Sequence, residues 1–149
     1  PGVTPLELRS KARQLRRQGL GLIVLDYLQL LSSGRRVESR QVEVSEFSRQ
    51  IKLLAKELAV PVVALSQLNR SAETRADRKP ALSDLRESGS LEQDADIVML
   101  LHRDDLNDPH STRRGEADVI VAKNRNGQTG TSALAFQGQF SRFANLAHP

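Results

Sequence analysis

The chain has 149 residues, 38% of them hydrophobic and 27% charged, with a formal net charge of +4, which is the composition of a globular domain rather than of a disordered chain. Its longest apolar runs are far shorter than the roughly 20 residues that cross a bilayer, which excludes a membrane-spanning helix. The chain has no cysteine and only three scattered histidines, so thiolate metal sites are excluded and a histidine metal site is unexpected. We therefore expect an intracellular protein that does not bind a membrane.

The first predicted element is a helix over residues 4–19. Thr4 is in position to cap the helix and Pro5 occupies its first turn, while Glu7 follows the cap by three residues, as in a capping box. Gly19 follows a basic last turn, which is a common signal for a helix end. Both ends of this helix are therefore marked in the sequence.

Strands and a second helix follow. Three apolar segments without strict alternation predict strands buried on both faces, over residues 20–26, 60–66 and 95–102. Apolar residues at three- and four-residue spacing predict an amphipathic helix from about Arg40 to Ala59. Two shorter strands, over 117–123 and 131–137, flank an Asn-Gly turn. This order predicts an α/β domain with a largely parallel sheet flanked by helices and a β-hairpin near the C-terminus.

The carboxyl ends of the first two strands carry polar residues, and functional groups gather at such ends in parallel sheets. Asp26 ends the first strand, as a Walker B aspartate does when it orients Mg²⁺ beside nucleotide phosphates. The alternative is an aspartate that caps the next segment. Gln67 follows the second strand and would contact a γ-phosphate or orient the attacking water if the strands are neighbours. Its alternative role is a hydrogen-bonded strand exit.

The segment LSDLRESGSLEQDAD is unusually dense in charged residues for a connector before a buried strand. Arg86 and the backbone amides near Gly89 would grip phosphates, because glycine lets the backbone approach a ligand closely. The alternative is a helix entry at which Ser90 and Gln93 form a capping box, and the two interpretations are compatible.

The segment AKNRNGQTG carries two cations at a strand end. Lys123 and Arg125 are two residues apart, so on an extended chain they project to the same side and suit a triphosphate. The alternative is a solvated hairpin tip with basic residues.

Taken together and in order, the segments of this chain resemble the bacterial replicative DNA helicases of the DnaB family. The resemblance is carried by LGLIVLDYLQLL, VPVVALSQLNR, LSDLRESGSLEQDADIVMLLHR, GEADVIVAKNRNGQTG and SRFANL. It implies a RecA-like motor domain that uses ATP and Mg²⁺. It also implies a cytoplasmic homohexamer that moves along single-stranded DNA and unwinds the duplex at the replication fork, with primase and a helicase loader as partners.

The resemblance implies roles for four residues at the ATP site. Asp26 matches the Walker B aspartate, which holds Mg²⁺ through water. Gln67 matches the glutamine that links the γ-phosphate to the DNA-binding loop. Lys123 and Arg125 match the basic pair that reaches the ATP of a neighbouring subunit and neutralises charge in the transition state.

The resemblance also implies a DNA-binding loop. Arg86, Glu87 and Gly89 match residues that contact the backbone of single-stranded DNA in the central channel. Aromatic residues make up only 3% of the chain, which suits a motor that holds the DNA backbone rather than stacking on bases.

The chain departs from the family pattern at the phosphate-binding loop. No G-x-x-x-x-G-K-[S/T] sequence occurs in the 149 residues, so the loop that holds the β- and γ-phosphates is missing. We therefore expect residues 1–149 to be the C-terminal portion of a RecA-like helicase ATPase domain, without Walker A and the N-terminal domain, and inactive as an ATPase on its own. Such a part would expose an apolar sheet edge, and we expect it to self-associate, to swap elements between copies or to need a complementary fragment.

Two other functions stay open at this point. A stand-alone DNA-binding or partner-binding module without catalysis would bind single strands in a salt-dependent way, and Arg86→Ala would weaken that binding. Another RecA-like ATPase, such as a relative of the recombinases, is the third possibility, and the loop DLRESGSLEQDAD argues for the helicase instead.

Overall fold

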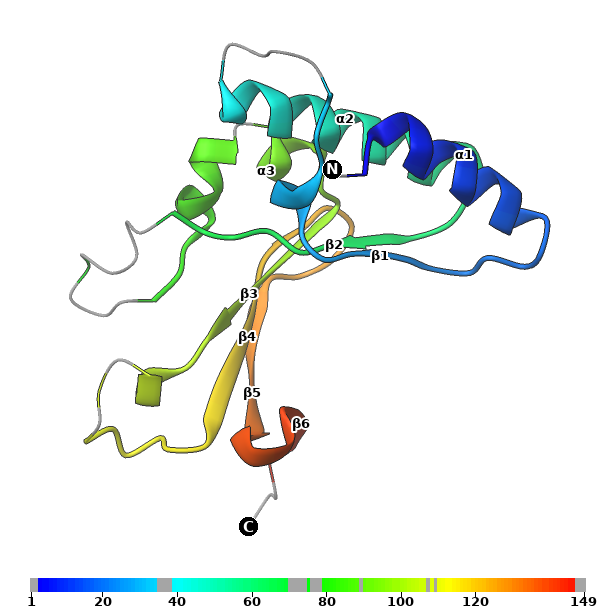
Figure 1. The fold of residues 1–149 in the computed structure, drawn as a ribbon. Helices are drawn as coiled ribbons and strands as arrows, with labels where there is room; N and C mark the ends of the chain where they lie inside the picture. The colour runs from blue at the N-terminus through cyan, green and yellow to red at the C-terminus, as the bar shows by residue number, and fades with distance from the viewer. Residues whose placement is uncertain are drawn as a thin grey trace. The chain divides into compact units, whose positions relative to one another are not determined.

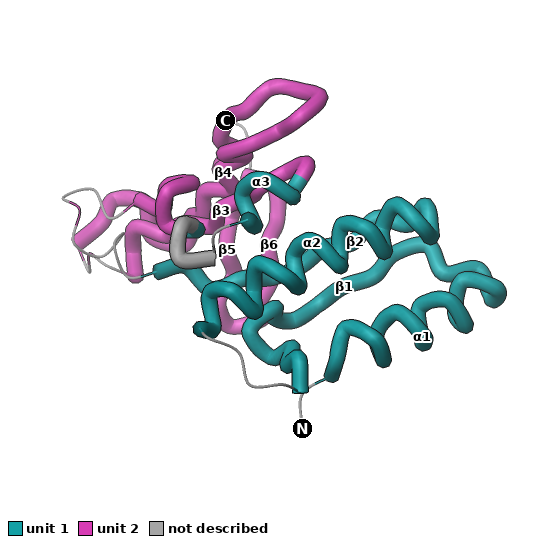
Figure 2. Tube along the Cα trace, turned by 90° about the horizontal axis from the view of Figure 1, so that it is seen from above, with its two compact units in different colours: residues 1–69, 85–95 teal, residues 70–84, 96–149 magenta. Residues whose placement is uncertain are grey.

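The computed structural model describes residues 3–34, 39–69, 75, 79–88, 90–106, 108 and 110–146, with the backbone alone at 86–88 (Figure 1). They form two compact units, which are described one at a time: unit 1 comprises residues 1–69 and 85–95, and unit 2 comprises residues 70–84 and 96–149 (Figure 2). Within the described ranges, no helix is long and apolar enough to cross a bilayer.

Helix α1 of unit 1 (Pro5–Arg16) begins as the sequence predicts. The Glu7 amide donates to Thr4 Oγ1 at 3.3 Å, and the Thr4 amide donates to Glu7 Oε2 at 2.8 Å, so the capping box is present. The chain leaves the helix through Gly19, whose φ of +91° is a conformation that glycine adopts without steric cost.

Helix α2 (Arg40–Leu58) confirms the predicted amphipathic helix. Ser39 caps it, because the Val42 amide donates to Ser39 Oγ at 3.3 Å. Its apolar stripe packs into two hydrophobic clusters of unit 1. The buried members are Ala12, Ile23, Leu54, Leu58 and Val60 in one cluster, and Leu28, Leu31, Phe47 and Ile51 in the other.

The sheet of unit 1 consists of two parallel strands, β1 (Ile23–Leu25) and β2 (Val62–Ala64). Both α1 and α2 lie on one side of it (Figure 1). On the other face, Val24 and Val63 are paired in register and are 58% and 44% exposed. The prediction that these strands are buried on both faces is therefore wrong for the described residues, which cover only one face.

The short helix α3 (Leu91–Asp94) belongs to unit 1 and shows a different entry from the one predicted. Ser48 Oγ donates to Asp94 Oδ2 at 2.7 Å and ties the helix to α2. Ser90 makes no capping bond from its side chain, since its hydroxyl donates to the Ser45 carbonyl at 3.0 Å. The proposed capping box with Gln93 is therefore wrong, because a backbone acceptor from α2 takes the Ser90 hydroxyl.

Unit 2 is a four-stranded antiparallel sheet. Its strands, in both chain and sheet order, are β3 (Ile97–His102), β4 (Glu116–Asn124), β5 (Gly130–Gln137) and β6 (Arg142–Asn145). The predicted hairpin is confirmed as β4 and β5, whereas β6 was not predicted. The predicted largely parallel sheet is wrong for the described residues, because β3 pairs antiparallel with β4 and only β1 and β2 are parallel. A parallel neighbour needs a long crossover, usually a helix, whereas the described residues of the connection from β3 to β4 form turns and a short 3₁₀ helix, Asp104–Leu106.

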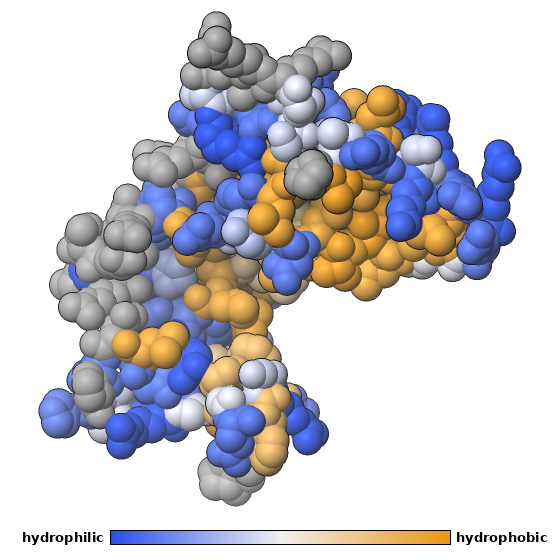
Figure 3. Space-filling view, viewed as in Figure 1, coloured by the Kyte–Doolittle hydropathy of each residue, from blue (hydrophilic) through white to orange (hydrophobic). Residues whose placement is uncertain are grey.

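Both sheets present uncovered apolar side chains among the described residues. In β3, Ile97, Met99 and Leu101 are 52%, 58% and 62% exposed, while the alternating residues are buried. Hydrophobic side chains also gather over β1 and β2 (Figure 3). Strands of this kind offer surfaces on which other chains can pack.

We expect the purified chain to self-associate, because these exposed apolar rows gain stability when they are removed from water. Light scattering over a range of concentrations measures this directly, and Leu101→Lys should reduce the association by placing a charge in the β3 row. A monodisperse monomer with a sharp unfolding transition would contradict the expectation.

Candidate functional site

Asp26 is the residue directly after β1, at the carboxyl end of a parallel strand. It is exposed, so its carboxylate does not need a buried partner, and its peptide bond to Tyr27 is cis. Among the described residues, no group of three or more His, Cys, Asp or Glu side chains could hold a metal ion. A single carboxylate nevertheless fits Mg²⁺, which keeps several waters and binds through one or two carboxylates plus substrate phosphates.

Gln67 follows β2 and is also exposed. Because β1 and β2 are parallel neighbours in register, their carboxyl ends meet at one edge of the sheet. Two backbone bonds extend the pairing past the strands: Leu65 N donates to Leu25 O and Leu28 N donates to Leu65 O, both at 2.9 Å. The structure therefore brings the exits that carry Asp26 and Gln67 together, as the sequence predicted on the condition that the strands are neighbours.

A polar pair, Gln29 and Ser66, lies beside these exits and was not predicted from the sequence. Gln29 Nε2 donates to Ser66 Oγ at 3.1 Å, and Ser66 Oγ donates to the Gln67 carbonyl at 3.3 Å. The only signal in the sequence was position, since Gln29 follows Asp26 by three residues and Ser66 precedes Gln67.

Lys123 and Arg125 lie at the end of β4 in unit 2. The strand ends at Asn124, so the assumption of an extended chain through Arg125 is wrong, and Arg125 sits in the turn. The Arg125 amide donates to the Asp96 carbonyl at 2.8 Å, and its guanidinium lies 3.4 Å from the Asp96 carboxylate. With the two side chains about half exposed, at 47% and 56%, this ion pair is easily broken.

A β-bulge lies directly beside Lys123. Val98 pairs with Lys123 but Met99 pairs with Val121, so Ala122 is an extra residue in β4. Bulges turn a strand locally and change the direction of nearby side chains. The direction of Lys123 is thus set by the bulge, which no regular strand pattern would show.

The predicted DNA-binding residues are described only in part. The backbone of Arg86 and Glu87 lies in the 3₁₀ helix Leu82–Ser88, while their side chains and Gly89 lie outside the described residues. Their roles remain predictions from the sequence.

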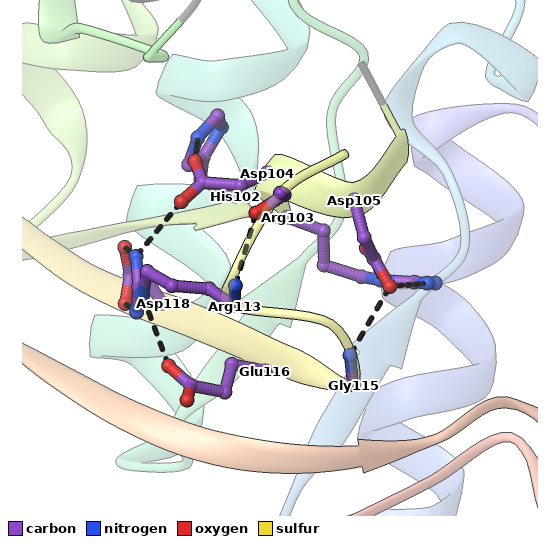
Figure 4. A network of polar contacts seen from close by, with 9 residues as sticks. His102, Arg103, Asp104, Asp105, Arg113, Gly115, Glu116 and Asp118 are labelled. Carbon is purple, nitrogen blue, oxygen red and sulfur yellow. Dashed lines mark hydrogen bonds and ion pairs between the residues drawn. The ribbon is translucent and has the colours of Figure 1, made fainter. Parts of the chain in front are cut away.

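A polar cluster in unit 2 surrounds Arg113 (Figure 4). Arg113 donates to both oxygens of Asp118 at 2.9 and 2.6 Å, to Glu116 at 2.9 Å and to Asp104 at 3.1 Å. Asp104 also lies 2.6 Å from His102 Nε2. Because one guanidinium holds three carboxylates, we interpret the cluster as a structural clamp on the connection between β3 and β4.

The clamp lowers the pKa of two of its carboxyl groups. Hydrogen bonds from Arg113 hold the pKa of the buried Asp118 below its usual value, and the contact with His102 does the same for the pKa of Asp104. A carboxyl group with a lowered folded-state pKa stabilises the fold above its unfolded pKa of about 3.9, and this stability is lost as the pH falls through the folded value.

We therefore expect the free energy of unfolding to be steady from about pH 7 to pH 5 and to fall at lower pH. Asp118→Asn should lower it by about 1–3 kcal/mol near neutral pH, because Arg113 loses a charged partner. The difference between wild type and variant should shrink as the pH falls through the lowered folded-state pKa of Asp118, because protonation removes the same charge from the wild type. Thermal unfolding followed by circular dichroism at each pH measures this difference in the free energy of unfolding. A difference that persists unchanged at low pH would contradict the interpretation of the Arg113 cluster as a clamp.

Comparison with solved structures gives the class of protein. One solved structure, described as an ATPase domain, matches with a TM-score of 0.93 and 46% identity, over 98% of this chain and 52% of that chain. "The Structure Of A DnaB-Like Replicative Helicase And Its Interactions With Primase" matches with a TM-score of 0.92 and 46% identity, over 98% of this chain and 36% of that one. The RadB recombinase, at 13% identity and a TM-score of 0.58 over 95% of this chain and 60% of its own, shares the fold alone. The chain is thus a mixed α/β part of a RecA-like ATPase domain.

The sequence comparisons give the family. The family model "DnaB-like helicase C terminal domain" matches residues 1–145, and the chain therefore belongs to this family. It is 64% identical over 148 residues to the replicative DNA helicase DnaB of Leifsonia xyli subsp. xyli, covering 99% of this chain and 32% of that protein. It is 52% identical over 148 residues to the replicative DNA helicase DnaC of Bacillus subtilis, covering 98% of this chain and 33% of that protein. The chain thus spans about a third of the length of these curated relatives.

Proposed function

We propose that the chain is the C-terminal portion of the motor domain of a longer ATP-dependent replicative DNA helicase, called here the parent helicase. The observation that carries the proposal is the parallel pairing of β1 and β2, which places the exits bearing Asp26 and Gln67 at one edge of a RecA-like sheet. Ligands of open α/β sheets bind at this edge. The parent helicase would act in the bacterial cytoplasm.

At this edge, Asp26 would hold Mg²⁺ through water, and Gln67 would contact the γ-phosphate of ATP. The bound ion would supply charge stabilisation for the transferring phosphoryl group. Asp26 contributes a negative charge at a fixed strand end, and Gln67 contributes an amide that can donate to a phosphate oxygen. Both side chains are exposed, as residues that must meet a ligand are.

Lys123 and Arg125 would act on the ATP of a neighbouring subunit in a homohexamer. Lys123 lies in the last residues of β4 and Arg125 in the turn that follows, and the half-exposed ion pair with Asp96 is weak enough for Arg125 to change partner. A guanidinium placed at a neighbour's γ-phosphate stabilises the charge of the transition state.

Arg86, Glu87 and Gly89 would contact the backbone of single-stranded DNA. The basic and amide groups of such a loop bind phosphate without reading sequence, which suits a motor that must move along any strand. A solved relative is described with its primase interactions, and we propose primase and a helicase loader as partners of the parent helicase.

The purified 149-residue chain is expected to show no ATP hydrolysis, because it has no phosphate-binding loop to hold the β- and γ-phosphates. Release of phosphate with ATP and Mg²⁺, with and without single-stranded DNA, measures this. Robust metal-dependent turnover by the pure chain would contradict the assignment of this chain to one part of a divided site.

A further inference from the structure

Hydrogen bonds link the exits of β1 and β2 beyond the strand ladder. Gln29 Nε2 donates to Ser66 Oγ at 3.1 Å, and Ser66 Oγ donates to Gln67 O at 3.3 Å. We call this chain of groups the strand-exit relay. It starts at Gln29, three residues after Asp26 in the exit of β1, and ends on the backbone of Gln67, so it links the exit of β1 to the residue proposed to contact the γ-phosphate.

The start of the relay is held firmly by its surroundings. Leu28, the preceding residue, is 1% exposed and belongs to the core cluster with Phe47. The Gln29 carbonyl accepts a hydrogen bond from Arg40, which also donates to the Leu31 carbonyl at 2.9 Å. These contacts hold the backbone on both sides of Gln29. The Gln29 amide therefore donates to Ser66 from a fixed starting point.

The relay adds less to stability than a fully bonded polar group would. Gln29 Oε1 is buried and has no hydrogen-bond partner within the described part of the chain. An unpaired buried acceptor carries a desolvation cost that offsets the bond made by the other end of the amide. A contribution to the stability of the fold therefore does not explain why a side-chain amide occupies position 29.

We infer that Gln29 is a positioning residue that acts through Ser66 on Gln67. By fixing the Gln67 carbonyl, the relay sets the direction in which the Gln67 side chain leaves the strand exit. The inference rests on the proposed function, in which Gln67 contacts the γ-phosphate, and on the link to the DNA-binding loop that the family resemblance implies for this residue. Without the relay, Gln67 is displaced rather than removed, so the coupling between DNA and ATP hydrolysis weakens while ATP still binds.

The test measures ATP hydrolysis by the parent helicase with and without single-stranded DNA. Gln29→Met keeps the length of the side chain but cannot donate to Ser66. We expect the ratio of DNA-stimulated to DNA-free kcat to fall about tenfold, since a small displacement at a reacting centre is costly, with KM for ATP little changed. The melting temperature should shift by less than ~2 °C.

Ser66→Ala breaks the same link from its other end and should give a loss of the same size. The double variant should be no worse than either single variant, because both remove one interaction. Gln50→Met is the matched control, since Gln50 lies on the exposed side of α2 and bonds Glu46 at 3.0 Å, away from the strand exits. It should keep the wild-type ratio.

The outcomes separate this inference from the proposed function. A wild-type ratio in Gln29→Met, or losses in the two single variants that multiply in the double variant, would overturn the relay. Full hydrolysis in Asp26→Asn would instead overturn the proposed function. If Asp26→Asn abolishes hydrolysis while Gln29→Met and Ser66→Ala keep full DNA stimulation, only the relay is wrong.

Discussion

Asp26→Asn in the parent helicase is expected to lower kcat for ATP hydrolysis by about 100-fold or more. Asparagine keeps the shape of the side chain but removes the negative charge that would orient Mg²⁺ through water. The exposed position of Asp26 at the end of β1 means that the change leaves the core of unit 1 intact. The Mg²⁺ concentration needed for half-maximal hydrolysis should rise by about 10- to 100-fold, which steady-state rates over a magnesium titration would measure.

Asp108→Asn is the control for the loss of one acidic charge. Asp108 is exposed, and its carboxylate accepts a local hydrogen bond from the His110 amide at 2.8 Å. Its replacement should leave the hydrolysis rate and the magnesium titration unchanged. If Asp26→Asn behaves like this control, Asp26 does not act at the metal.

Arg125→Ala is expected to lower kcat by about 1,000-fold or more, the range measured when a finger arginine is removed from a phosphoryl-transfer site. The residue lies in the turn after β4, and its ion pair with Asp96 is half exposed, so the loss of stability should be small. Nucleotide should still bind, because the finger acts mainly on charge that develops in the transition state.

Mixed hexamers test whether Arg125 acts between subunits. In rings formed from equal amounts of Asp26→Asn and Arg125→Ala, about one quarter of the interfaces would join an intact Asp26 to an intact Arg125. Two inactive proteins should therefore regain part of the activity when their subunits are mixed. Arg9→Ala is the control arginine, since its exposed bond to Glu57 at 2.7 Å contributes little. Mixed rings that stay inactive would indicate that both residues act in one subunit.

Helices α1 and α2, and the positions of Asp26 and Gln67 at the exits of the first two strands, could be predicted from the sequence, because their signals are local. The Thr4 and Glu7 capping box spans four residues, and the apolar stripe of α2 repeats within one segment. The strand exits followed from one rule, that functional groups gather where parallel strands end.

Strand pairing and the Gln29 contacts could not be predicted, because they depend on residues far apart in the chain. Nothing within the segment 95–102 shows that it pairs with 116–124 in antiparallel orientation. Gln29 meets Ser66 only through the register of β1 and β2. The Ser90 hydroxyl bonds the Ser45 carbonyl, 45 residues earlier, which a local capping rule does not include.

The central claim is that this chain forms one part of the ATP site of a replicative helicase. It is tested most directly by a chimera in which the chain replaces the matching third of the Leifsonia xyli helicase, to which it is 64% identical. We expect the purified chimera to hydrolyse ATP and unwind a forked DNA duplex, and its Asp26→Asn variant to do neither. A folded hexameric chimera that binds DNA but neither hydrolyses ATP nor unwinds the fork would contradict the claim.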